Sequence, residues 1–206
     1  MSAHDHAHAH DHEHEHEHDD HEHDELDDEA REEVESEARR RLALAQIRQY
    51  PDAALRLRAN EVEAIDDDIG RLAERMIALM HDAQGLGLAA TQVGVLRRVF
   101  VFDLEGEGAK TVVNPKLADH GTEVATDEEG CLSLQGVRVP VERPVQVVLE
   151  GTNEQGEDVR YELEGMPARV VQHELDHLDG VLIIDRTDDE HRKQALSVLR
   201  PRVVLR

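Results

Sequence analysis

Apolar residues recur in alternating steps of three and four between positions 62 and 79. The positions are Val62, Ile65, Ile69, Leu72, Met76 and Leu79. This spacing places the side chains on one stripe of an α-helix. We therefore predict an amphipathic helix of about 20 residues that Gly85 ends.

Shorter apolar runs predict β-strands. They are residues 98–104, 111–114, 144–150 and 158–164, and the last two flank the turn sequence Asn153-Glu154-Gln155-Gly156 as in a hairpin. A second helix is expected from Met166-Pro167, with proline in its first turn, to Gly180, and a short amphipathic helix near 188–199. Strands and helices do not alternate regularly, which favours an α+β fold over a doubly wound one.

The start of the chain has a different composition. Residues 1–24 alternate histidine with Asp, Glu or Ala and hold ten of the 15 histidines. They offer too few apolar groups to offset the entropy cost of ordering, so we expect a disordered tail. Residues 25–46 predict a helical extension, acidic early and basic late, as the helix dipole favours. Residues 196–206 form a basic C-terminal tail.

Charge and composition narrow the function classes. Residues 1–38 carry 17 acidic side chains and one basic one, whereas the rest carries 30 and 22, so the globular part is only mildly acidic. Acidity argues against DNA as a partner, and two Phe, two Tyr and no Trp argue against base stacking. One cysteine excludes an intramolecular disulfide and fits a reducing compartment. No apolar run approaches the ~20 residues of a membrane span, so we expect a cytoplasmic protein.

The most informative stretch is His173-Glu174-Leu175-Asp176-His177 in the second helix. Two histidines four residues apart project from one helix face, where both imidazoles can bind one metal ion. Glu174 lies about 100° round the helix, within reach of a water on that metal. A bound metal lowers the pKa of water from ~15.7 toward ~7, and the carboxylate can accept the proton.

A catalytic metal site of this kind usually has a third protein ligand. The upstream candidate is Cys131; the downstream candidates, as in a zincin-like peptidase, are Asp185, Glu190 and His191. The residues alone leave both metallohydrolases open. A third hypothesis is a metal buffer, in which the histidine-rich tail is the functional part.

Three separated motifs resemble those of the peptide deformylase family. They are Gly85-Leu86-Gly87-Leu88-Ala89-Ala90-Thr91-Gln92, Glu129-Gly130-Cys131-Leu132-Ser133 and Gln172-His173-Glu174-Leu175-Asp176-His177. Tyr50-Pro51-Asp52 with Leu55-Arg56 resembles the family's N-terminal signature. The resemblance covers about residues 44–195, the expected catalytic domain. Gln135 stands where the family often has proline, a departure that concerns the loop and not the ligands.

The resemblance implies a metal-dependent hydrolase that removes the N-formyl group from the N-terminal formylmethionine of newly synthesised proteins. It implies Cys131, His173 and His177 as metal ligands, and Glu174 as general base and then acid. The side-chain amide of Gln92 and the backbone N–H of Leu132 would stabilise the oxyanion. It also implies antiparallel or mixed sheets around a central helix that carries the HExDH motif.

The same resemblance implies how the substrate, an N-formylmethionyl nascent peptide, is held. The peptide would add as a strand, and Gly85, Gly87 and Gly130 would let its backbone approach. The methionine pocket would be walled by Leu86, Val170 and His173. Asp176 would pair with Arg143 in support of the site.

The resemblance implies one divalent ion, with ferrous iron preferred, although imidazole and thiolate also suit zinc, nickel or cobalt. The histidine-rich tail could bind further metal ions. Basic residues follow Glu190 without another acid and suggest a ribosome contact; they are Arg192, Lys193, Arg200, Arg202 and Arg206.

Overall fold

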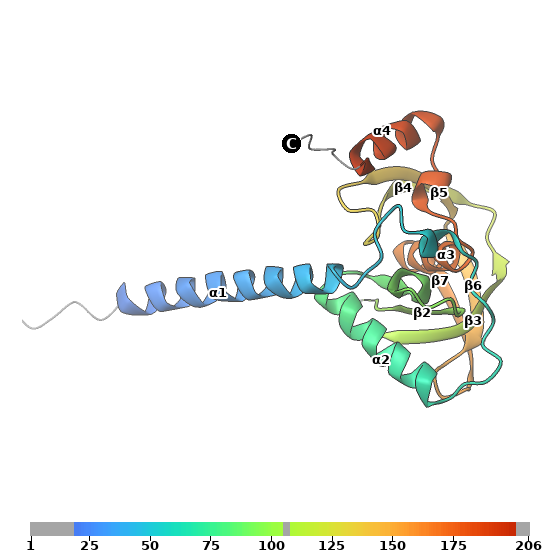
Figure 1. Cartoon of the computed structure of the whole chain (residues 1–206), viewed down its shortest axis with the longest axis horizontal. Helices are drawn as coiled ribbons and strands as arrows, with labels where there is room; N and C mark the ends of the chain where they lie inside the picture. The colour runs from blue at the N-terminus through green and yellow to red at the C-terminus, as the bar shows by residue number, and fades with distance from the viewer. Residues whose placement is uncertain (1–18, 105–107, 201–206) are drawn as a thin grey trace, which may run out of the picture. The chain divides into compact units, whose positions relative to one another are not determined.

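The computed structural model describes residues 19–104 and 108–200 of the chain (Figure 1). The chain divides into two units, Met1–Ala38 and Arg39–Arg206, and both sheets belong to the second. Helix α1 spans Asp19–Leu44. The helix therefore begins before the expected residue 25, because residues 19–24 contain no proline or glycine that would interrupt it. The rest of the expected disordered tail, and the C-terminal residues 201–206, lie outside the described residues.

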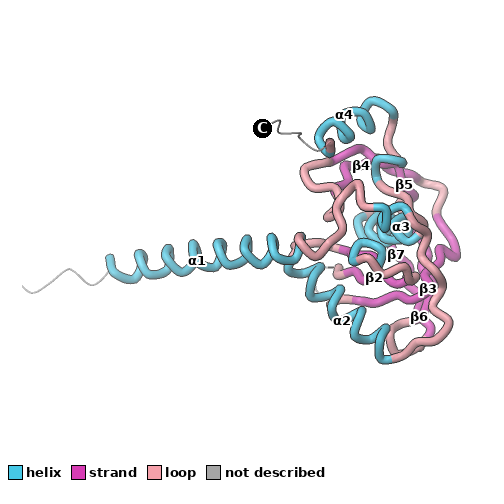
Figure 2. Tube along the Cα trace, in the orientation of Figure 1, coloured by secondary structure: helices cyan, strands magenta, loops and turns pink. Residues whose placement is uncertain are grey.

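The second unit contains two antiparallel sheets (Figure 2). The larger sheet has the strand order β1-β2-β3-β6-β7, and the smaller one pairs β4 with β5. The strands are β1 Gly87–Ala89, β2 Val99–Phe102, β3 Lys110–His120, β4 Val124–Gly130, β5 Arg138–Pro144, β6 Gln146–Thr152 and β7 Asp158–Glu164. The β6–β7 hairpin and the α+β class are confirmed.

Strand β2 lies at the centre of the core because both of its faces are covered. Val99 and Val101 pack in one apolar cluster with helix α2, Asp67–Asp82. Phe100 and Phe102 pack in another with helix α3, Met166–Leu178. Successive residues of a strand point to opposite faces of the sheet. The four-residue apolar run VFVF therefore contributes side chains to both apolar clusters.

Helix α2 is shorter than the apolar period predicts. Its N-cap is Asp66, whose carboxylate accepts the backbone N–H groups of Asp68 and Ile69. Val62 and Ile65 precede the helix but pack in the same cluster as its apolar face. The prediction of a helix from residue 62 was wrong because the apolar residues of a mostly exposed, non-helical segment happened to continue the helical spacing.

The two strands of the smaller sheet were not predicted. Strand β4 is mostly polar and exposed, and β5 contains two prolines, so neither has a clear strand pattern. Helix α3 agrees with the predicted second helix, and α4, Asp189–Leu199, with the predicted short one. Two short 3-10 helices carry candidate site residues. They are η2, Ala90–Val93, which contains Gln92, and η3, Ile183–Asp185, which contains Asp185. None of the helices in the described part of the chain is long and apolar enough to cross a membrane.

Candidate active site

Helix α3 brings the two histidines of the sequence motif together. The rings of His173 and His177 have centroids 4.9 Å apart. Cys131 comes from another part of the chain, directly after β4 ends at Gly130. Its Sγ lies 3.2 Å from Nε2 of His177. Donor atoms of the three residues all lie within 4.8 Å of one another, so the structure places the upstream candidate, Cys131, with the histidines.

The downstream candidates are engaged elsewhere. Asp185 accepts the N–H of Leu182 at 2.9 Å and forms an ion pair with Arg56. His191 Nδ1 lies 2.7 Å from Asp188 at the exposed start of α4. Glu190 is exposed on the same turn. Among the described residues, none of these joins the cysteine and histidine group.

Electrostatics around His173 prepare it as a ligand. Its Nδ1 lies 3.0 Å from Oε2 of Glu129. Burial alone would raise the pKa of Glu129, but hydrogen bonds from His173 and Arg143 lower that pKa to about 2. Because the carboxylate of Glu129 can only accept a hydrogen bond, His173 carries a proton on Nδ1. Its Nε2 is then the ring atom available as a metal ligand.

His177 is buried, and burial lowers its pKa well below the ordinary histidine value, with nearby His173 adding to the effect. A neutral imidazole is the form that binds metal. Its Nδ1 is buried with no hydrogen-bond partner within the protein. Burial opposes a charge on His173, but hydrogen bonds with Cys131 and Glu129 raise its pKa well above the ordinary histidine value, so a metal would have to displace a proton from its ring. The two imidazoles and the soft sulfur of Cys131 are a donor set that fits a divalent transition metal.

Glu174 is the buried carboxyl group of the site. Glu174 is 4% exposed. Burial raises the pKa of its carboxyl group to about 7, despite the opposing effect of His173 and Arg143. Its Oε2 has no partner within the protein. A Cβ on Gly87 would stand 2.4 Å from Oε1. The glycine at 87 thus leaves room for this carboxyl group.

The raised pKa of Glu174 predicts a pH-dependent stability in the metal-free protein. A carboxyl group whose pKa rises from 4.5 to about 7 on folding destabilises the fold once the pH exceeds 4.5. Relative to native protein, we expect Glu174→Gln to gain about 2 to 3 kcal/mol of unfolding free energy between pH 5 and pH 8. Urea unfolding of both metal-free proteins measures this difference. If the difference in unfolding free energy between the two proteins were the same at pH 5 and pH 8, the carboxyl group of Glu174 would be charged in the folded protein at both values.

Gln92 sits on η2 with its amide orientation fixed. Its Oε1 accepts the N–H of Ala89 at 2.8 Å, so Nε2 points the other way. That nitrogen donates to Ser133 Oγ at 3.0 Å and lies 3.7 Å from Cys131 Sγ. The amide nitrogen thus donates to Ser133 and to the sulfur of Cys131, beside the ligand group.

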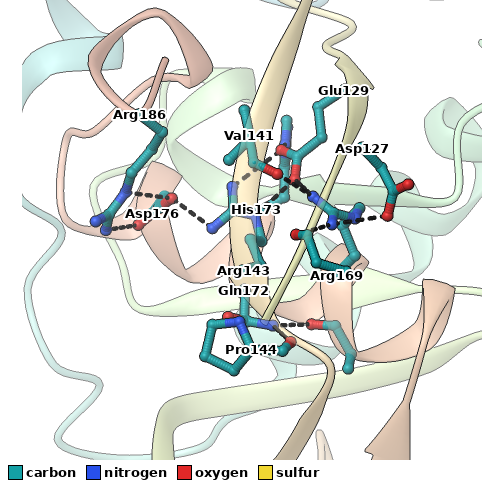
Figure 3. A network of polar contacts seen from close by, with 12 residues as sticks. Asp127, Glu129, Val141, Arg143, Pro144, Arg169, Gln172, His173, Asp176 and Arg186 are labelled. Atoms are coloured by element: carbon teal, nitrogen blue, oxygen red, sulfur yellow. Dashed lines mark hydrogen bonds and ion pairs between the residues drawn. The ribbon is translucent and has the colours of Figure 1, made fainter. Parts of the chain in front are cut away.

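A buried ionic network supports the ligand histidines (Figure 3). Arg143 donates to Glu129 at 2.6 and 2.9 Å and to Asp176 at 2.9 Å, so the predicted Arg143–Asp176 pair is present. Arg169 donates to Glu129 at 2.7 Å, and Arg186 donates to Asp176 at 2.5 Å. Two carboxylates are thus shared among three guanidinium groups, which compensates their charge in the interior.

Removing Arg143 is expected to destabilise the protein strongly. Loss of one partner of a buried pair costs about 3 to 5 kcal/mol. We expect Arg143→Met to lie at the lower end, near 3 kcal/mol, because Glu129 keeps Arg169 and Asp176 keeps Arg186. Chemical denaturation measures the loss. Arg160→Met is the control, because Arg160 pairs with Glu150 at the surface and should cost less than about 1 kcal/mol. Equal losses in both variants would contradict a structural role for the network.

A cavity of about 790 Å³ opens on the site. Cys131, His173 and Glu174 line it, as do four of the five residues predicted to bind substrate: Gly85, Leu86, Gly130 and Val170. Gly87 does not line it. That Gly87 binds substrate stays a prediction; Gly87 pairs with Phe102 in the sheet and lies against Glu174, which lines the cavity.

Several residues of the site were missed from the sequence. Arg40 and Leu44, from the end of α1, line the cavity beside the expected substrate residues. Glu129 belongs to the second motif, but the sequence predicts no role for it. Arg169 carried a signal, since a lone cation in the apolar run Ala168–Val171 needs a buried partner.

Comparisons with known proteins agree with this geometry. A family model described as polypeptide deformylase matches residues 44–193. The chain is 48% identical over 147 residues to a peptide deformylase of Clostridium botulinum, covering 71% of this chain and 98% of that protein. A solved peptide deformylase from Thermotoga maritima superposes with a TM-score of 0.67 at 46% identity, covering 69% of this chain and 96% of the other. A peptide deformylase from Synechococcus elongatus, solved in complex with actinonin, superposes with a TM-score of 0.71 at 36% identity. The match covers 74% of this chain and 85% of the other.

Proposed function

This chain belongs to the polypeptide deformylase family and is an enzyme of that family, and from this premise we propose its reaction in detail. It removes the N-formyl group from the N-terminal formylmethionine of newly synthesised proteins and releases formate. One observation supports this above all. The buried carboxyl group of Glu174, with a pKa of about 7, lines the same cavity as Cys131 and His173. These two residues and His177 are the three residues that could hold a metal ion.

Cys131, His173 and His177 would hold one divalent ion. We propose ferrous iron, and the same thiolate and imidazole donors accept zinc, nickel or cobalt. When bound, the ion would polarise the formyl carbonyl and acidify a water molecule. His173 is held for this role by Glu129, and Glu129 by Arg143 and Arg169.

Glu174 moves the proton. Its carboxylate takes a proton from the attacking water as the water oxygen bonds to the formyl carbon. The bond between that carbon and the methionine nitrogen then breaks, and Glu174 delivers the proton to the leaving amine. A pKa near 7 suits both steps, because the group can accept and release a proton at neutral pH.

Two donors would stabilise the charge that develops on the formyl oxygen. The first is the Gln92 amide, which the Ala89 and Ser133 contacts aim toward Cys131. The second is the backbone N–H of Leu132, a residue that lines the cavity.

The cavity walls suit an extended peptide that begins with methionine. Leu86 and Met166 are exposed apolar side chains that line the cavity, and Val170 is a buried one that also lines it. They would contact the methionine side chain. Gly85 and Gly130 expose backbone on the same cavity and would pair with the peptide.

Formate release tests the proposal. The native protein, loaded with ferrous iron without oxygen, is given formyl-Met-Ala-Ser and acetyl-Met-Ala-Ser. We expect formate from the first peptide and no acetate from the second, because a narrow metal pocket admits hydrogen on the acyl carbon and excludes methyl. Removal of the metal with a chelator should stop the reaction, and iron should restore it. Folded, iron-loaded protein that releases no formate would refute the proposal, and internal cleavage of longer peptides would favour a peptidase.

A further inference from the structure

The segment Ile47–Tyr50 runs between two parts of the active site. The N–H of Arg48 donates to the carbonyl of Gln92 at 2.7 Å. The N–H of Tyr50 donates to the carbonyl of Ser133 at 2.9 Å. Between them, Nε2 of Gln49 donates to the carbonyl of Leu132 at 3.0 Å. This short segment thus connects the residue proposed to bind the oxyanion with the residues that follow the cysteine ligand.

The peptide group between Leu132 and Ser133 is held at both ends. Its N–H points at Sγ of Cys131, with nitrogen and sulfur 3.4 Å apart. Its C=O accepts the side-chain amide of Gln49. The N–H and C=O of one peptide point in opposite directions. A donor that fixes the oxygen therefore also fixes the N–H against the sulfur.

This arrangement acts on the thiolate that would bind the metal. An N–H aimed at a thiolate stabilises its negative charge and orients the sulfur. The bond from Gln49 polarises the same peptide and strengthens its N–H as a donor. The N–H of Leu132 belongs to the preceding peptide, which shares the Cα of Leu132, so a fixed Leu132–Ser133 peptide limits the movement of the backbone that carries this N–H.

Gln49 itself is held in place without touching the cavity. Its Nε2 also donates to the carbonyl of Ile47 at 3.2 Å, and its side chain is half-buried. Gln49 does not line the cavity that holds Glu174. Its direct contact with the residues of the site is the bond to the carbonyl of the Leu132–Ser133 peptide.

We propose that Gln49 is a positioning residue for the Cys131 ligand and, through the same peptide, for the N–H of Leu132. The second part rests on the proposed function, since it concerns the oxyanion. The first part concerns only the metal ligand and can be tested without the reaction.

The experiment uses the full chain with cobalt(II) in place of iron. Because Cys131 is the only cysteine in the sequence, a sulfur-to-cobalt absorption band reports on it alone. Three variants are compared: Gln49→Met lacks a donor, Gln49→Glu places a carboxylate against the Leu132 carbonyl, and Gln49→Lys keeps a donor of similar reach. Cobalt affinity is measured by competition with a chelator, and thermal unfolding of the metal-free proteins checks the fold.

We expect Gln49→Met to weaken cobalt affinity about tenfold and to shift the band, the range seen when a partner of a metal ligand is removed. Gln49→Glu should weaken it further, and Gln49→Lys should stay close to native. With iron, kcat should fall in the same order with KM nearly unchanged, because an oxyanion donor acts in the transition state. Gln155→Met and Gln155→Glu, in the exposed β6–β7 turn, are matched controls and should match native protein.

Native-like affinity and band in Gln49→Met would overturn the inference, as would a loss in Gln49→Lys equal to that in Gln49→Met. If Gln49→Glu fails to fold, the methionine and lysine variants still decide. Native protein that binds cobalt normally but releases no formate would refute the proposed function and leave the metal-ligand part of this inference standing.

Discussion

Glu174→Gln is expected to lower kcat for formate release from formyl-Met-Ala-Ser about 10²- to 10⁴-fold, the contribution typical of a positioned acid–base group. Glutamine keeps the shape of the side chain but cannot take a proton from water or return one to the amine. Because Glu174 is not one of the three grouped donors, the variant should bind iron or cobalt as native protein does. Steady-state kinetics and metal analysis on the same sample measure both effects.

Glu128→Gln is the matched control for this change. Glu128 lines the same cavity but is exposed, so its replacement should leave kcat within about twofold of native, in keeping with the small effects of surface substitutions. A Glu174→Gln enzyme that keeps native kcat would contradict the assignment of Glu174 as the proton carrier. Together with the expected gain in metal-free stability, a loss of activity would show that burial of this carboxyl group trades stability for catalysis.

Cys131→Ala is expected to lower cobalt affinity by at least about a hundredfold, since loss of a mere partner of a ligand already costs 10- to 100-fold. The variant should release no measurable formate, because two histidines alone do not complete a three-ligand site. Chelator competition measures the affinity, and disappearance of the sulfur-to-cobalt band would confirm that the thiolate was the ligand.

His191→Ala distinguishes the two metallohydrolase hypotheses. His191 is bonded to Asp188 at the exposed start of α4, so its replacement should change neither affinity nor turnover. If His191→Ala removed the metal and Cys131→Ala did not, the peptidase-like ligand set would hold instead. Deletion of the histidine-rich tail, residues 1–24, tests the metal-buffer hypothesis. Under that hypothesis, the truncated protein would lose its capacity to take up metal ions and would keep any formate release.

Local patterns in the sequence were enough to predict the elements that carry most of the chemistry. Helix α3 and the β6–β7 hairpin follow from proline, glycine and apolar periodicity within a dozen residues. The spacing of His173 and His177 predicts their shared face because a helix fixes the relation of residues four apart. These are short-range relations, and the backbone geometry of a single element decides them.

Residue type and spacing alone, by contrast, left the third ligand open between Cys131 and three downstream residues. Cys131 meets His177 across 46 residues of chain, and no local rule relates positions so far apart. The resemblance to a family supplied the answer that periodicity did not. The same limit explains the start of α2, where Val62 continued the helical spacing although Asp66 caps the helix.

The sequence by itself therefore determined the helix of the HExxH motif, the class of fold and the residues able to bind metal. Only the tertiary structure decided which of those residues meet, that Gly87 makes room for Glu174, and that Gln49 holds the peptide after Cys131. The physical reason is that residue type and spacing fix what a side chain can do, whereas the pKa of Glu174 and the ion pairs of Arg143 depend on burial and on neighbours brought from distant segments.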